Sequence, residues 1–173
     1  IDAIKYAASK DVLVVIAAGN ESYDLDVTNK YPNDTYDGSP EYANNVLIIG
    51  ALSPSYGSKM VADFSNYGKN NVDIYAPGDE IYATTPINTY EYLQGTSMAS
   101  PNVAGVATLI RSYYPSLTAV QVKQVIMESG TPLKNTVLLG EDKHKANFAE
   151  ASKSGRIVNA YNALLLAKKM AKK

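Results

Sequence analysis

The stretch Asp11-Val-Leu-Val-Val-Ile-Ala-Ala18 is an unbroken apolar run rich in β-branched residues. A run without polar alternation is typical of a strand that is buried on both faces of a parallel sheet. Gly19 and Asn20 end the run, and the residues before it, through about Ser9, have the apolar spacing of a helix. The stretch therefore predicts an α/β fold in which a helix leads into a buried strand.

The rest of the chain adds strands first and helices later. Further strands are predicted at 46–49, 60–64, 72–75 and 81–83, and helices at 97–112, 118–127 and 158–170. Thr118 and Gln121 have the spacing of a capping box. The last helix is expected to bury Tyr161, Leu164 and Leu165. This order of elements predicts a three-layer fold, with a mostly parallel sheet flanked by helices.

The bulk properties exclude several classes of function. The chain has 173 residues, which is the length of one domain, and its formal net charge of −1 argues against nucleic acid or an anionic membrane as the main partner. It has no cysteine, so thiolate chemistry is excluded, and its apolar runs are too short to span a bilayer. It begins at Ile1, inside a predicted helix and without Met or a signal peptide, which predicts a fragment.

The segment Gln94-Gly-Thr-Ser-Met-Ala-Ser-Pro-Asn-Val-Ala-Gly105 places Ser97 at the start of a predicted helix. Backbone N–H groups and the positive end of the helix dipole point outward there. Such a position suits a nucleophile whose attack generates an oxyanion, because the donors are already oriented. On spacing alone, however, Ser97 fits an ordinary N-cap at least as well.

Four segments resemble the subtilase family of serine proteases. Gly95-Thr-Ser-Met-Ala-Ser-Pro101 is similar to the family's nucleophile signature, and Val14-Val-Ile-Ala-Ala-Gly-Asn20 to the segment that carries its oxyanion donor. Residues 64–78 and 155–160 resemble later family segments, in the family's order. The resemblance covers nearly the whole chain. It implies that residues 1–173 are the C-terminal portion of a single subtilisin-like peptidase domain.

The resemblance also implies roles for individual residues. Ser97 would be the nucleophile of a serine endopeptidase that forms an acyl-enzyme, and Asn20 would donate to the oxyanion together with the Ser97 N–H. Residues expected to bind the substrate are Ala17, Ala18, Gly19 and Thr96. The expected substrate is a peptide or protein, no cofactor is required, and the expected location is outside the cell or in the cell envelope.

The family's catalytic Asp and His precede its Ser in the chain, and their segments are absent from residues 1–173. The one histidine, His144, lies in a lysine-rich stretch and is interpreted as a solvated loop residue. Loss of the histidine in such a triad lowers turnover by roughly six orders of magnitude, so this chain alone is expected to be inactive. Its uncovered core would bind the missing N-terminal part of the domain or a second copy.

Three weaker interpretations accompany this one. Oxygen-bearing side chains that would allow a structural calcium site are Asp24, Asp26, Asn33, Asp34 and Asp37. Their spacing does not match an EF-hand loop, so a solvated acidic loop is the preferred interpretation and no metal ligand is assigned. The alternatives to an enzyme are a non-catalytic subtilase-like module that binds peptide or protein, and a structural remnant of a processed precursor.

Overall fold

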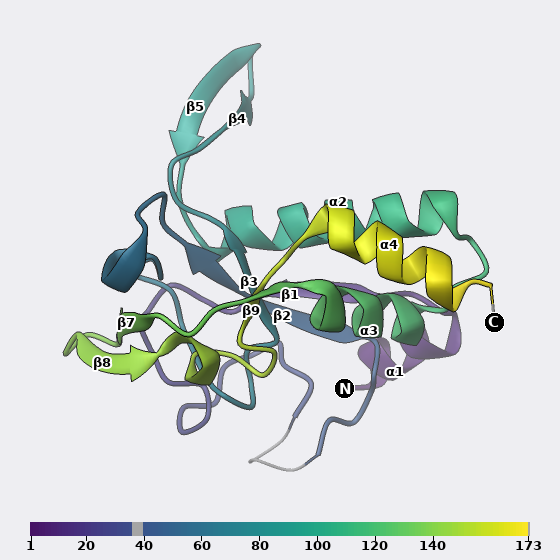
Figure 1. The fold of residues 1–173 in the computed structure, drawn as a ribbon, viewed down its shortest axis with the longest axis horizontal. Helices are drawn as coiled ribbons and strands as arrows, with labels where there is room; N and C mark the ends of the chain where they lie inside the picture. Colours follow the sequence, from purple (N-terminus) through teal and green to yellow (C-terminus); the bar gives the residue numbers. More distant parts are fainter. Residues whose placement is uncertain (36–39, 173) are drawn as a thin grey trace.

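A computed structural model of the protein describes residues 1–35 and 40–172 (Figure 1). The main sheet has the strand order β1-β2-β3-β9-β6, in which β6 is antiparallel and the others are parallel. Its strands are β1 (Val14–Ala17), β2 (Val46–Leu52), β3 (Ile74–Pro77), β6 (Thr131–Pro132) and β9 (Arg156–Ile157). The helices are α1 (Asp2–Ser9), α2 (Thr96–Tyr113), α3 (Ala119–Ser129) and α4 (Ala160–Met170).

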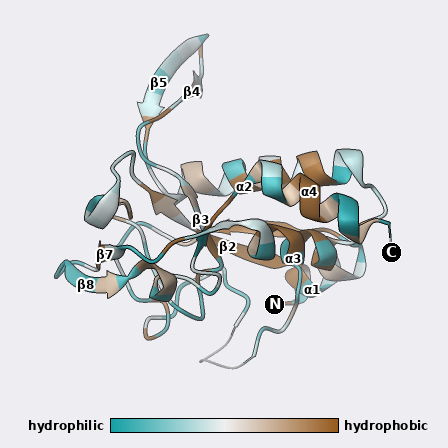
Figure 2. Ribbon diagram, in the orientation of Figure 1, coloured by the Kyte–Doolittle hydropathy of each residue, from teal (hydrophilic) through white to brown (hydrophobic). Residues whose placement is uncertain are grey.

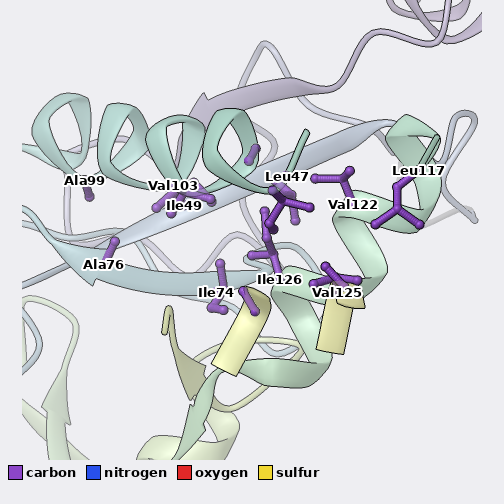
Figure 3. Close-up of a cluster of buried hydrophobic side chains, with 14 of the residues drawn as sticks. Leu47, Ile49, Ile74, Ala76, Ala99, Val103, Leu117, Val122, Val125 and Ile126 are labelled. Atoms are coloured by element: carbon purple, nitrogen blue, oxygen red, sulfur yellow. The ribbon is translucent and has the colours of Figure 1, made fainter. Parts of the chain in front are cut away.

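The sheet is the middle of three layers, as the sequence predicts. All seven residues of β2 are buried, and alternate side chains point to opposite faces. On one face, Leu47 and Ile49 pack with α2, α3 and α4 in a cluster that Figure 3 shows from the side. On the other face, Val46 and Ile48 pack with a second cluster that includes Ile4 of α1. In Figure 2 the central strands and parts of the helices that cover them accordingly have hydrophobic colours.

The structure tests one prediction about how α3 begins and one about which residues α4 buries. The capping box of α3 is confirmed, because the Thr118 hydroxyl accepts from the Gln121 N–H and the Gln121 side chain accepts from the Thr118 N–H. The pattern predicted for α4 is wrong at two of its three residues: Tyr161 is 71% exposed and Leu165 is 46% exposed, whereas Leu164 is partly buried against the core. Close packing of α4 on α3 buries small side chains instead, at Ala163 and Ala167.

The strand predicted at 60–64 is also wrong. Within that range Val61 makes one isolated bridge to Leu52. Its neighbours Met60 and Ala62 are buried without belonging to a strand, and Asp63 is exposed. Two hairpins were predicted only in part, because the strand at 81–83 was the one expected strand among their four. β4 (Ile81–Thr85) pairs with β5 (Thr89–Leu93) and projects from the body in Figure 1, and β7 (Thr136–Leu139) pairs with β8 (His144–Asn147). Two 3₁₀ turns, η1 (Gly57–Lys59) and η2 (Phe148–Glu150), complete the described elements.

Candidate active site

The fold brings together the two motifs that the sequence singles out. Asn20 lies just beyond the C-terminal end of β1, and Thr96 begins α2. The Thr96 N–H donates to Asn20 Oδ1 at 2.9 Å, across 76 residues of sequence. Parallel sheets gather ligand sites at the carboxyl ends of their strands, and this junction lies at such an end.

Thr96 fixes the orientation of the Asn20 amide. Its fully buried hydroxyl donates to Asn20 Oδ1 at 2.9 Å and accepts from the Gly19 N–H at 3.0 Å. Because the contact from the Thr96 N–H requires an acceptor, the oxygen of the Asn20 amide must face α2, and Nδ2 must face the other way. Thr96 is therefore closed to solvent, and any effect of its side chain on a substrate is transmitted through Asn20 and Gly19.

Two N–H donors converge beside Gly95. An ideal Cβ built on Gly95 would lie 3.4 Å from Asn20 Nδ2 and 3.5 Å from the Ser97 backbone nitrogen. The φ angle of Gly95 is +146°, which side chains rarely allow. Within the described residues neither donor has a protein acceptor, so the pair is free to bind an anionic oxygen. The backbone angle therefore favours glycine at this position, and a side chain there would occupy the space beside the two donors.

Ser97 is exposed in the first turn of α2. Its hydroxyl is thus accessible to a substrate that reaches the two donors. Pro101 lies inside the helix, in its second turn, whereas the sequence places it in or near the first. Since proline has no N–H, the Ser97 carbonyl lacks the usual i+4 partner, which a helix tolerates best near its start.

The predicted substrate-binding residues Ala17, Ala18 and Gly19 line a cavity of about 90 Å³. Leu25 and Ile48 supply further apolar surface. The opposite side comes from the polar loop at residues 28–35. Asn20, which carries one of the two N–H donors, directly follows the lining residue Gly19 in the sequence.

His144 lies at the start of β8, in a hairpin rather than in the loop that the sequence indicates. Its Nδ1 is 2.8 Å from Asp142 Oδ1, and its ring contacts Tyr67 edge-on at 5.7 Å between centroids. The hydrogen bond with His144 lowers the pKa of the exposed Asp142 carboxyl. Its contacts therefore join His144 to its own hairpin and to Tyr67, and not to Ser97.

The acidic residues of the calcium hypothesis have separate partners. Asp26 accepts from the backbone and side-chain N–H groups of Asn70 and Asn71, and the buried Asp34 lies 3.9 Å from Lys123 Nζ. Asp37 lies outside the described residues. Among the residues that are described, no group of three or more acidic, histidine or cysteine side chains is arranged to hold a metal ion.

Sequence reasoning missed Lys30 and Glu21, which form a salt bridge of 2.6 Å at the cavity. They are nine residues apart in an irregular loop, so neither helical nor strand periodicity relates them. The one signal in the sequence was Glu21, a charged residue that directly follows Asn20. Within the described chain, no helix is both long and apolar enough to cross a membrane.

Comparison with known proteins agrees with this geometry. The family model described as the subtilase family matches residues 1–152. Subtilisin DY of Bacillus licheniformis is 37% identical over 139 residues, which cover 80% of this chain and 47% of subtilisin DY. An intracellular serine protease of Paenibacillus polymyxa is 34% identical over 140 residues, covering 78% of this chain and 40% of that protein.

Solved structures show the same fold. A structure of proteases from Pseudoalteromonas arctica superposes with a TM-score of 0.71 at 28% identity, over 96% of this chain and 46% of that one. The structure of the subtilase cytotoxin SubAB gives a TM-score of 0.75 at 23% identity, over 98% of this chain and 53% of the other. The α/β sheet, the Asn20–Thr96 junction and these matches together define a subtilisin-like protein. The chain belongs to the subtilase family, and it spans about half the length of the relatives it matches.

Proposed function

We propose that this chain is the C-terminal portion of a serine endopeptidase domain that cleaves peptide bonds through an acyl-enzyme on Ser97. The observation that carries the proposal is the convergence of Asn20 Nδ2 and the Ser97 N–H beside Gly95. A binding module has no chemical need for two free donors next to an exposed serine hydroxyl. Transition-state stabilisation requires that arrangement.

In the proposed reaction, the Ser97 hydroxyl oxygen attacks the carbonyl carbon of the scissile peptide bond. The negative charge that develops on the carbonyl oxygen is stabilised by Asn20 Nδ2 and the Ser97 N–H, while Thr96 keeps the Asn20 amide in position. The amine leaves with a proton, and water then hydrolyses the ester. The side chain that precedes the scissile bond would enter the cavity beside Gly19.

A base must accept the Ser97 proton for this reaction, and serine is a weak nucleophile without one. The contacts of His144 join it to Asp142 and Tyr67, which gives no support for it as that base. We therefore propose that the His and Asp come from an N-terminal segment of the same domain. In its absence the chain is expected to be inactive.

The outer edge of β1 is the proposed docking place for that segment. In the described chain β1 pairs with β2 on one side only, and it is the first strand of the sheet order. A groove of about 220 Å³ lies beside the free edge. Val12 and Val15 line the groove from the segment that contains β1, and Ala104 lines it from α2. An additional parallel strand would satisfy the edge N–H and C=O groups and cover the groove. A second copy of the chain is the competing occupant.

The direct test measures peptide hydrolysis by the full-length gene product. The Ser97→Ala variant should lose activity by about six orders of magnitude, whereas Ser100→Ala, in the same motif, should retain it. Unchanged hydrolysis in Ser97→Ala would refute the proposed nucleophile. If the full-length protein binds peptides but never hydrolyses them, the non-catalytic binding module becomes the function.

We also propose that the enzyme needs no cofactor and acts outside the cell or in the cell envelope, as secreted subtilisins do. Similarity to those relatives supports the location. Because one relative is named as intracellular, fractionation of the producing cells is the appropriate test. For calcium, the test is the melting temperature with and without a chelator, and a shift would contradict the proposal that the acidic loop is simply solvated.

A further inference from the structure

The cavity beside Gly19 contains a charged group that bears on substrate choice. Lys30 lines the cavity together with the apolar side chains of Leu25 and Ile48. Its Cε lies 3.4 Å from the point where a Cβ on Gly19 would be, so its aliphatic chain runs alongside the residue that precedes Asn20. The ammonium group is therefore held close to the path of a substrate side chain.

Glu21 holds the Lys30 ammonium from one side. Glu21 Oε1 accepts from Lys30 Nζ at 2.6 Å, and Oε2 accepts from Asn66 Nδ2 at 2.8 Å. Asn66 is fully buried and also donates to the Ala18 carbonyl at 2.8 Å, so the Glu21 carboxylate is anchored to the cavity wall. The hydrogen bond from Lys30 lowers the pKa of Glu21, so the Glu21 carboxyl group is ionised at neutral pH.

The two partners differ in what they can still bind. Both Glu21 oxygens already accept a hydrogen bond, whereas Glu21 uses one of the three N–H donors of the Lys30 ammonium. A basic substrate side chain would have to displace Lys30 in order to reach Glu21. A carboxylate can instead be added to the ammonium group without breaking the existing pair.

We propose that Lys30 makes this cavity select a carboxylate side chain, that of Glu or Asp, on the substrate residue before the scissile bond. The inference rests on the proposed function, which puts that side chain in the cavity. The apolar walls receive the methylene groups, and the Lys30 ammonium donates to the carboxylate. The lysine chain along Gly19 also leaves less room for an aromatic side chain in a cavity of about 90 Å³.

Peptide binding to the full-length protein with the Ser97→Ala substitution tests this directly, because binding does not depend on turnover. The probes are N-acetyl-Ala-Ala-Pro-X carboxylates in which X is Glu, Gln, Lys or Phe, measured by calorimetry. The Glu peptide should bind roughly ten- to a hundredfold more tightly than the uncharged, equally long Gln peptide, as expected for a hydrogen bond to a charged group. The Lys and Phe peptides should bind more weakly than the Glu peptide.

Two variants isolate the lysine. Lys30→Met keeps the chain length and removes the charge, so it should abolish the preference for Glu over Gln. Glu21→Gln removes the competing carboxylate and should increase that preference. Equal binding of the Glu and Gln peptides, a preference that survives in Lys30→Met, or no binding of any peptide would each overturn the inference.

A fluorophosphonate probe on the same protein with Ser97 intact reports the proposed function separately. Labelling of Ser97 without a preference for Glu refutes the role of Lys30 and leaves the protease standing. A preference for Glu without labelling confirms the charge selection by Lys30 and refutes the proposed catalytic function.

Discussion

The two sides of β1 differ in how far this chain completes them. Beyond its C-terminal end, Thr96 holds the Asn20 amide through two hydrogen bonds, and the nitrogens of two N–H donors, Asn20 Nδ2 and Ser97 N, lie close to the same point beside Gly95. Along its outer edge, the strand has no partner in the described chain, and Val12, two residues before the strand, is 47% exposed. Under the proposed function, this difference means that the groups that stabilise the oxyanion and the groups that activate the serine are carried by separate parts of one domain.

The largest expected effect comes from the completed side. Replacing Asn20 with Ala in the full-length protein removes one of the two donors, so kcat should fall roughly a hundred- to a thousandfold. The KM should change little, because the lost hydrogen bond strengthens in the transition state rather than in the bound substrate. Steady-state kinetics measures both quantities. If only KM rises and kcat is unchanged, Asn20 binds the substrate in the ground state. That result would contradict the role given to the C-terminal end of β1 in the comparison.

A charge at the open edge should act on assembly. Val12→Asp puts a carboxylate on exposed surface in the isolated chain, where the fold tolerates it. If an N-terminal segment covers this edge, the buried charge should weaken its association by about a hundredfold. Binding of a separately produced N-terminal segment, measured by calorimetry, checks this. Tyr92→Asp on the exposed β5 strand is the matched control, and equal effects of the two substitutions would refute the assigned edge.

A buried ionic cluster at the start of β3, away from the candidate site, provides a test of stability. Asp73 accepts from the Ile48 N–H at 2.7 Å and lies 3.9 Å from Lys123 Nζ, and burial raises its pKa to about 6. Because the folded state then holds a proton that the unfolded chain releases near pH 4, the contribution of Asp73 to stability falls as the pH rises from about 4 to 6. The loss is on the order of 2–3 kcal/mol.

Denaturant unfolding of the wild type and of Asp73→Asn between pH 4 and 8 measures this contribution. The wild type should lose stability relative to the variant through this range, and the difference should level off above about pH 7. A difference that does not change with pH would contradict the raised pKa. Burial also raises the pKa of Asp34, and the charge of Asp34 in turn raises the pKa of Asp73, so the measured difference reports the two carboxyl groups together.

The smallest expected effect concerns the orientation of Asn20. Thr96→Val removes the hydroxyl that bridges Asn20 Oδ1 and the Gly19 N–H, while the Thr96 N–H contact remains. We expect kcat to fall about tenfold and the free energy of unfolding to fall by about 1–3 kcal/mol, since a buried N–H loses its acceptor. Thr96→Ser keeps the hydroxyl and should restore kcat. Failure of that rescue would assign the Thr96 methyl group, and not its hydroxyl, as the important feature.

Much of the fold follows from local sequence. The run that contains β1 correctly predicts a strand, but its predicted burial on both faces is wrong: in the described chain β1 is the first strand of the sheet and only its Ile16 is buried. The segment at 46–49 predicts a central strand, because a strand buried on both faces needs no alternation, and all of β2 is buried. The capping box likewise marks the start of α3. The burial of α4 could not be predicted in this way. Its apolar residues outnumber the positions that face α3, and only the packing distance selects Ala163 and Ala167 over Leu165.

The residues of the candidate site also differ in whether the local sequence predicts them. A recognisable motif marks Ser97 and Asn20, but the function of Thr96 depends on a contact across 76 residues. The position of Lys30 depends on how an irregular loop folds over the end of β1, and no periodicity governs such a loop. Sequence motifs thus identify the groups that react, whereas the groups that orient them and shape the cavity emerge from tertiary structure.

Fluorophosphonate labelling of Ser97 tests the central claim most directly. The isolated chain, the full-length protein, and the isolated chain mixed with a separately produced N-terminal segment are compared, with Ser97→Ala as the blank. The account predicts negligible labelling of the chain alone, rapid labelling of the full-length protein, and labelling of the mixture that saturates with added segment. Equally rapid labelling of the isolated chain, or no labelling of the full-length protein, would contradict it.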